Sequence, residues 1–173
     1  MARFDLFSAD SAHLNEVASG RSPESDEKRF QGEIDMELTD DYKGAVTQAL
    51  TDYYAAFSTL DAHAVAPYFH EPSQLVSPAG VGTTSTHAAV IAVFQPAMDA
   101  LRARGFAKSE LTNLRLKRLS AASVIAGGVA VRRKSDGQEL ERNGVVYLLQ
   151  KTNAGWQIAA IVIHDADHAL RPE

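Results

Sequence analysis

Cysteine is absent from this sequence of 173 residues, and so is any apolar run long enough to cross a bilayer. Without a thiol, the chain can form no disulfide, thiolate nucleophile, iron–sulfur cluster or cysteine-ligated zinc site. The first residues also lack the charged and then apolar pattern of a signal peptide. Together these absences predict a cytoplasmic protein with no membrane partner.

The sequence has no excess of positive charge either. It contains 17 Lys and Arg residues against 22 Asp and Glu residues, which gives a formal net charge of -5. Proteins that bind nucleic acids normally present a basic patch or stripe, so we expect no nucleic-acid partner. The glycines of Gly80-Val81-Gly82 lack the lysine and hydroxyl residues of a phosphate-binding loop. No cofactor is therefore expected.

Polar and acidic residues dominate residues 1–38, which we interpret as an acidic, partly flexible N-terminal extension. Its first apolar residues could dock as a short amphipathic helix on the domain or on a second subunit: Phe4, Leu6 and Phe7. Residues 39–168 have the length and composition of one globular domain. Residues 169–173 are expected to form a short tail.

Apolar residues spaced three and four positions apart predict three helices in the first part of this domain. The first helix should bury a stripe formed by Val46, Leu50, Tyr53, Phe57 and Leu60. Asp61 should cap a short second helix, which must end before Pro72. The third runs from a cap at residues 84–86 to Gly105, with a kink expected at Pro96. Its expected buried residues are Val90, Val93, Phe94, Ala97 and Leu101.

Strands are predicted elsewhere in the domain. A short strand is expected at residues 74–76, followed by a loop at residues 77–82. Four longer runs of strand-forming residues then follow, at about 109–119, 123–134, 140–151 and 156–164. Tight turns separate them, most clearly at Asp136-Gly137. Consecutive strands joined by tight turns are antiparallel, so the C-terminal half should form a meander.

The last two strands carry apolar residues on both alternation sets, as Val146 and Leu148 do against Val145, Tyr147 and Leu149. Successive side chains of a strand point to opposite faces, so both faces of the sheet should be buried. Three helices can cover one face. We therefore predict a homodimer in which a second subunit covers the other face.

This order of elements, over about residues 41–165, resembles that of the SnoaL-like and ketosteroid-isomerase-like families of the nuclear-transport-factor-two-like superfamily. Two local sequences carry the resemblance, namely Tyr53-Tyr54-Ala55-Ala56-Phe57-Ser58-Thr59-Leu60-Asp61 and Gly155-Trp156-Gln157-Ile158. The resemblance implies an α+β fold in which three N-terminal helices wrap a curved antiparallel β-sheet and form a cone with an internal pocket. These motif residues pack the fold and recur in members with different activities, so they do not specify one.

The resemblance also implies roles for particular positions. Tyr53 matches a tyrosine that holds the developing enolate in ketosteroid isomerases, and Tyr147 falls near that family's second oxyanion donor. The stretch that carries the family's carboxylate base, Asp-Pro-x-Gly, is replaced here by Ser77-Pro78-Ala79-Gly80. A serine cannot abstract a proton from carbon without a base of its own. Two tyrosine donors without a base favour binding of a small hydrophobic, carbonyl-bearing or phenol-bearing molecule.

The residues expected to bind the ligand lie on the helices and strands that would face the pocket: Tyr53, Phe57, Tyr68, Ser77, Phe94, Met98 and Tyr147. Such aromatic residues at helical spacing more often belong to a plain core. A basic run in the predicted meander is interpreted as a solvated sheet edge that prevents aggregation: Arg132, Arg133 and Lys134.

Three residues are candidates for proton transfer, because histidine titrates near neutral pH. His164 ends the last predicted strand beside Asp165, and His87 begins the third helix near the Ser77 loop. A polar strand exit and a surface or capping histidine are the simpler explanations of these residues, and we prefer them. His164 and His168 have no evident third ligand, so no metal site is predicted.

Three classes of function follow from these patterns. We favour a small-molecule-binding protein whose mostly apolar pocket carries a few tyrosine, histidine and serine groups. A lyase, isomerase or cyclase is the alternative, with a histidine in place of the missing aspartate. A protein-interaction module that uses the acidic N-terminal segment and the two-faced sheet is the third.

Overall fold

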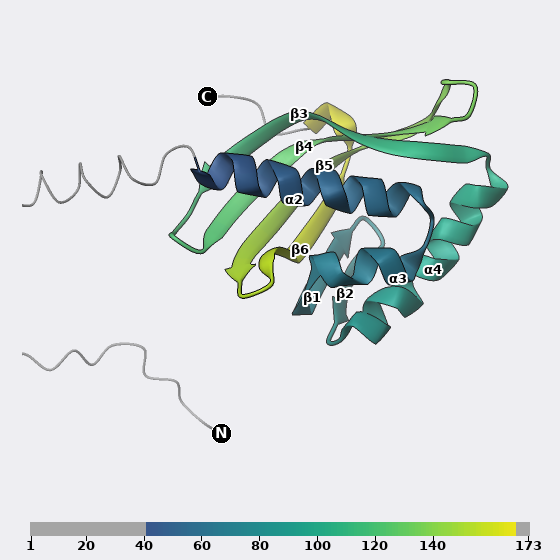
Figure 1. The fold of residues 1–173 in the computed structure, drawn as a ribbon. Helices are drawn as coiled ribbons and strands as arrows, with labels where there is room; N and C mark the ends of the chain where they lie inside the picture. The colour runs from purple at the N-terminus through teal and green to yellow at the C-terminus, as the bar shows by residue number, and fades with distance from the viewer. Residues whose placement is uncertain (1–40, 169–173) are drawn as a thin grey trace, which may run out of the picture. The chain divides into compact units, whose positions relative to one another are not determined.

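Residues 41–168 are described in the computed structural model, and they form three α-helices that pack on a curved, six-stranded sheet (Figure 1). The predicted extension at 1–38 and the predicted tail at 169–173 lie outside the described residues. The helices and strands are α2 (Asp41–Ser58), α3 (Ala62–Val65), β1 (Phe69–Ser77), β2 (Gly80–Thr84), α4 (His87–Ala103), β3 (Phe106–Arg118), β4 (Ser123–Lys134), β5 (Glu139–Thr152) and β6 (Gly155–His164). Two short 3-10 helices, η1 (Ala66–Tyr68) and η2 (Ala166–His168), complete them.

The predicted stripe of α2 is confirmed, because all its members are buried: Val46, Leu50, Tyr53, Phe57 and Leu60. Asp61 then caps α3, and its carboxylate accepts a hydrogen bond from the backbone N–H of His63 at 2.9 Å. The helical segment ends at Tyr68, where β1 begins, four residues before Pro72. None of the helices in the described residues combines the length and apolar composition that a membrane crossing requires.

The third predicted helix is α4, which begins after Thr86 and is followed by Gly105 at a φ of 79°. The Thr86 hydroxyl accepts a hydrogen bond from the N–H of Ala89 at 3.2 Å, as a capping residue does. Helix α4 continues through Pro96, and the kink there stays a prediction. The expected burial of Val93 and Ala97 is wrong, because both residues are exposed, Val93 by 45%.

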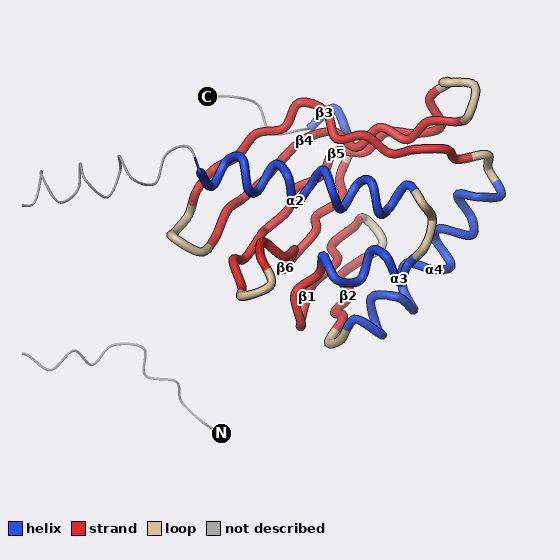
Figure 2. Tube along the Cα trace, viewed as in Figure 1, coloured by secondary structure: helices blue, strands red, loops and turns tan. Residues whose placement is uncertain are grey.

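The sheet has the strand order β2-β1-β6-β5-β4-β3 (Figure 2). The four long strands form the predicted antiparallel meander, and β1 adds to it in parallel with β6. The loop expected at residues 77–82 is a tight hairpin instead, and β2 starts at Gly80. Gly80 has a φ of 129°, a conformation that favours glycine, so the chain can reverse there. A buried hydrogen bond of 2.7 Å between the Ser73 and Thr84 hydroxyls joins the two strands.

Helices α2 and α4 lie over the same face of the sheet, which we call the inner face (Figures 1 and 2). On β5 the inward side chains of Val145, Tyr147 and Leu149 are buried. Between them, Val146 and Leu148 point to the outer face, where the Leu148 residue is 37% exposed. The two-faced apolar pattern is therefore present in the fold, and the homodimer inferred from it stays a prediction.

Candidate functional site

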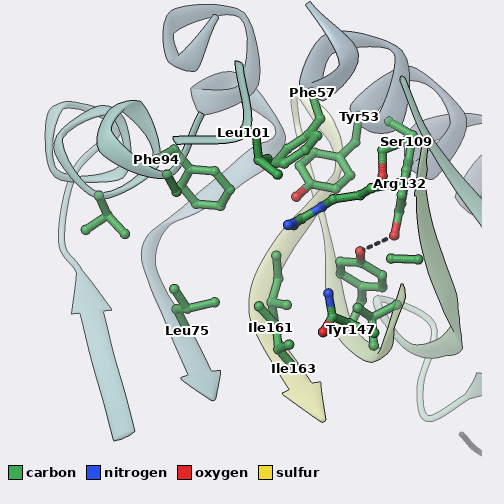
Figure 3. A pocket seen from close by; sticks show the side chains of 16 residues that line it. Tyr53, Phe57, Leu75, Phe94, Leu101, Ser109, Arg132, Tyr147, Ile161 and Ile163 are labelled. Carbon is green, nitrogen blue, oxygen red and sulfur yellow. Dashed lines mark hydrogen bonds between the residues drawn. The ribbon is translucent and has the colours of Figure 1, made fainter. Parts of the chain in front are cut away.

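A cavity of about 130 Å³ lies between the inner face of the sheet and helices α2 and α4 (Figure 3). Most of its lining is apolar: Phe57, Leu75, Val93, Phe94, Ala97, Leu101, Ala130, Val145, Ile161 and Ile163. Six residues supply polar atoms: Tyr53, Tyr54, Ser109, Arg132, Asn143 and Tyr147. Because Val93 and Ala97 line the cavity and are also exposed, the cavity opens to solvent beside α4. An apolar cavity of roughly 150 Å³ accommodates one benzene molecule, so this one suits a single ring.

Aromatic side chains hold the cavity wall in place. The ring of Tyr53 meets four neighbouring aromatic rings edge-on, with centroid separations of 5.3 to 6.1 Å: Tyr54, Tyr68, Phe69 and Tyr147. Edge-to-face pairs at such separations are favourable because the positive edge of one ring faces the negative face of another. Helix α2 is thus fixed against β1 and β5 by packing, and the position of the Tyr53 hydroxyl group follows from it.

The Tyr54 and Tyr147 hydroxyl groups share a buried hydrogen bond of 2.8 Å across the cavity wall (Figure 3). Burial raises the pKa of Tyr54 to about 12, despite the opposing effects of the Tyr147 hydrogen bond and of the Arg132 charge. Burial also raises the pKa of Tyr147 well above 10.0. Both tyrosines are therefore neutral near pH 7 and act only as hydrogen-bonding groups.

Burial likewise raises the pKa of Tyr53, and the nearby Tyr54 adds to the increase. The Tyr53 hydroxyl group makes no hydrogen bond to any described residue. As Figure 3 shows, its side chain points toward the cavity, next to the side chain of Arg132. The Tyr53 hydroxyl is consequently a neutral donor that a ligand could use.

Arg132 is the one charged residue among those that line the cavity. It lies on β4, and its guanidinium carbon is 5.1 Å from the centroid of the Phe57 ring. Its Nη1 donates a hydrogen bond to Glu141 on β5, whose other carboxylate oxygen pairs with Arg104 at 2.5 Å. The interpretation of Arg132 as part of a solvated edge is therefore wrong, since its side chain is 22% exposed and faces the cavity.

Four of the seven predicted ligand-binding residues line the cavity: Tyr53, Phe57, Phe94 and Tyr147. The other three do not. Tyr68 packs edge-on against the ring of Tyr53, and Met98 is fully buried in the core. Ser77 lies at the turn between β1 and β2, where its hydroxyl oxygen accepts a hydrogen bond from the N–H of Ala79 at 3.2 Å. Ser77 therefore stabilises the turn between β1 and β2 and does not reach the cavity.

The candidate proton-transfer groups also lie outside the cavity lining. His164 is paired with Gly144 on β5, and its ring covers the space where a side chain of Gly144 would stand. Its Nδ1 donates a hydrogen bond to the backbone oxygen of Asp165 at 2.8 Å. His87 has its Nε2 atom 2.9 Å from the backbone oxygen of Phe69, so a hydrogen bond to the start of β1 explains its position. No group of three or more potential metal ligands occurs in the described part of the chain.

The sequence offered a signal for Arg132 that its interpretation as an edge residue missed. Positions 124, 126, 130 and 132 belong to one alternation set of β4, and Val124, Ala126 and Ala130 are buried on the inner face. Arg132 continues that set toward the cavity. Asn143, which pairs with Ala130 across the strands, lines the cavity for the same reason.

The described lining residues include no aspartate, glutamate, histidine or lysine. The titratable groups of the cavity lining are the three tyrosines, whose pKa values are raised, and Arg132, which stays protonated as arginines do in proteins. At neutral pH each can donate a hydrogen bond, but none is poised to accept a proton from a substrate. This chemistry suits the binding of a small molecule better than proton-transfer catalysis.

A family model described as NTF2-like protein (DUF6841) matches residues 40–166 of the sequence. No curated protein matches the chain. Among solved structures, an NTF2-like protein with a cystatin-like fold from Novosphingobium aromaticivorans is 18% identical, with a TM-score of 0.60 over 85% of this chain and 92% of that chain.

Two further structures are similar. The protein Aln2 from a Streptomyces species is 15% identical, with a TM-score of 0.64 over 75% of this chain and 94% of that one. A ketosteroid isomerase-like protein from Erwinia carotovora atroseptica is 15% identical, with a TM-score of 0.53 over 77% of this chain and 99% of that chain. At such identities the similarity shows the fold alone. The expected α+β cone and the resemblance at the superfamily level are confirmed, whereas the narrower SnoaL-like assignment stays a prediction.

Proposed function

The chain belongs to the NTF2-like protein family (DUF6841), and from that premise we propose that its cavity binds a small, mostly apolar molecule. The observation that carries the proposal is a hollow of about 130 Å³ surrounded by aromatic and branched side chains. Protein interiors are close-packed and leave few voids larger than a water molecule. An apolar hollow with a few convergent polar groups is the usual form of a ligand site.

The size and opening of the cavity define the shape of the ligand. One aromatic ring, or a branched aliphatic group of similar volume, fills the space between Phe57, Phe94 and Ile161. A multi-ring compound such as a steroid exceeds it. A substituent on the ring can extend past Val93 and Ala97, where the cavity meets solvent.

Binding without catalysis is favoured over the lyase, isomerase or cyclase alternative. That alternative requires a histidine at the reacting group, and His87 and His164 both hydrogen-bond to backbone oxygens away from the cavity lining. The interaction module depends on the segment at 1–38, which lies outside the described residues. The small-molecule site is the function that the described geometry supports best.

Ligand-observed saturation-transfer NMR tests the proposal directly, with p-cresol, benzyl alcohol and benzoate as single-ring probes. The variant Ala97→Phe places a ring at the opening of the cavity and should abolish saturation transfer to all three. The matched control is Ala100→Phe, because Ala100 is also exposed on α4 but does not line the cavity. Equal transfer in the two variants, or no transfer to any probe in the unmodified protein, would contradict the proposal.

A further inference from the structure

Arg132 brings more positive charge to the cavity than its partner neutralises. The Glu141 carboxylate binds Arg132 through one oxygen and Arg104 through the other, at 2.5 Å in the second case. Two guanidinium groups therefore share one carboxylate, and the cluster of three side chains carries a net charge of +1. Arg104 lies at the end of α4 and does not line the cavity, whereas Arg132 does.

One edge of the Arg132 guanidinium lacks a partner. Its Nη1 binds Glu141, but its Nε is buried and makes no hydrogen bond to any described residue. A buried donor without a partner costs about 1–3 kcal/mol, and more when the group is charged. Native proteins rarely tolerate such a donor unless water, an ion or a ligand satisfies it.

Two other free donors line the same cavity as Arg132, and the described lining contains no carboxylate. The Tyr53 hydroxyl and the Asn143 side-chain amide line the same cavity, and neither makes a hydrogen bond within the described part of the chain. The position of the guanidinium is fixed by the Phe57 ring, 5.1 Å below it, and by Glu141. Planar guanidinium edges of this kind recognise carboxylates through two parallel hydrogen bonds.

We propose that Arg132 binds the carboxylate of the ligand, so that the cavity is selective for a small acid whose single ring or branched chain packs against Phe57 and Phe94. This inference rests on the proposed function and defines the chemical class of its ligand. The carboxylate supplies the negative charge and the acceptors that the Arg132 cluster lacks. Tyr53 and Asn143 donate to the remaining lone pairs, and the apolar lining contacts the ring or branched chain of the ligand.

Isothermal titration of benzoate against its uncharged analogue benzyl alcohol provides the test. Benzoate should bind at least tenfold more tightly to the unmodified protein. Arg132→Met keeps the length of the side chain and removes its charge, so it should erase that preference while leaving benzyl alcohol binding within about threefold. Arg132→Lys should retain part of the preference, because it keeps the charge without the planar edge.

Two further variants separate the role of Arg132 from a general charge effect. Arg133→Met removes the same charge from the adjacent position, where Arg133 pairs with Glu110 at 2.9 Å and does not line the cavity, and it should leave the preference unchanged. Glu141→Gln removes the carboxylate that competes for Arg132 and should tighten benzoate binding severalfold. If Arg132→Met fails to fold, the opposite effects expected for Arg132→Lys and Glu141→Gln still test the inference.

The outcomes distinguish this inference from the proposed function. Equal binding of benzoate and benzyl alcohol, both blocked by Ala97→Phe, would overturn the role of Arg132 and keep the small-molecule site. A benzoate preference that survives Arg132→Met, or that Arg133→Met removes equally, would overturn it as well. Absence of binding by either compound would overturn both.

Discussion

The hydroxyl groups of Tyr54 and Tyr147 lie 2.8 Å apart, although 93 positions separate the two residues in the sequence. This hydrogen bond joins α2 to the middle of β5 in the wall of the cavity. Both residues are at most 7% exposed, so removal of one hydroxyl group leaves the other in largely apolar surroundings. The pair therefore affects both the stability of the domain and the shape of the site.

The effects of removing the two hydroxyl groups on the free energy of unfolding should not be additive. Tyr54→Phe leaves the Tyr147 hydroxyl buried without a partner, and we expect a loss of about 1–3 kcal/mol in the free energy of unfolding. The double variant Tyr54→Phe/Tyr147→Phe should be less destabilised than the sum of the single variants, by about 1 kcal/mol. Urea denaturation of the four proteins measures this coupling. Strict additivity would mean that the hydrogen bond contributes nothing.

The buried tyrosines should make the domain sensitive to alkali. The pKa of Tyr54 rises from 10.0 to about 12 on folding, so below pH 10 its contribution to stability is fully present, and it is lost as the pH rises from 10 to 12. Each such tyrosine reduces the free energy of unfolding by about 1.4 kcal/mol per pH unit in that range. Denaturation at pH 9 and pH 11 should show a shallower fall in Tyr54→Phe. The same fall in both proteins would contradict the shift.

Gly128 should tolerate no side chain. A Cβ atom at this position on β4 would stand 2.7 Å from the backbone oxygen of Thr112 on β3, and a backbone atom cannot move away cheaply. Gly128→Ala should therefore destabilise the domain by about 1–3 kcal/mol. Gly44→Ala is the control, because Gly44 is exposed on α2 with open space around it, and alanine there should stabilise by about 0.5–1 kcal/mol. Similar effects of the two substitutions in denaturation curves would refute the close approach of β3 and β4.

The outer face of the sheet provides a test of the predicted homodimer. Val146, Leu148 and Val162 lie on neighbouring strands of that face, and α2 and α4 cover the opposite one. Size-exclusion chromatography with light scattering should give twice the chain mass, and Leu148→Glu should reduce it to one chain. Leu119→Glu, at an exposed residue between β3 and β4, should leave the dimer intact. A monomer at micromolar concentration would remove the prediction.

The sequence alone was sufficient for the helices and the long strands. The stripe from Val46 to Leu60, the Asp61 cap and the Asp136-Gly137 turn act over a few residues, and their effect does not depend on distant parts of the chain. Hence the order of elements and a quarter of the sixteen lining residues, Tyr53, Phe57, Phe94 and Tyr147, could be predicted from spacing and from the resemblance.

The tertiary structure decided which polar side chains reach the cavity. Between β5 and β6 the register shifts at Leu148 and Leu149, so Ile158 faces inward before the shift and Ile161 after it. If the side chains alternated without interruption from Ile158, that of His164 would point to the inner face. The register shift is a β-bulge, and it turns the His164 side chain to the outer face, onto Gly144. A single extra residue in a strand changes the face of every side chain that follows. No local pattern in the sequence reveals such a residue, because the pairing with a distant strand defines it.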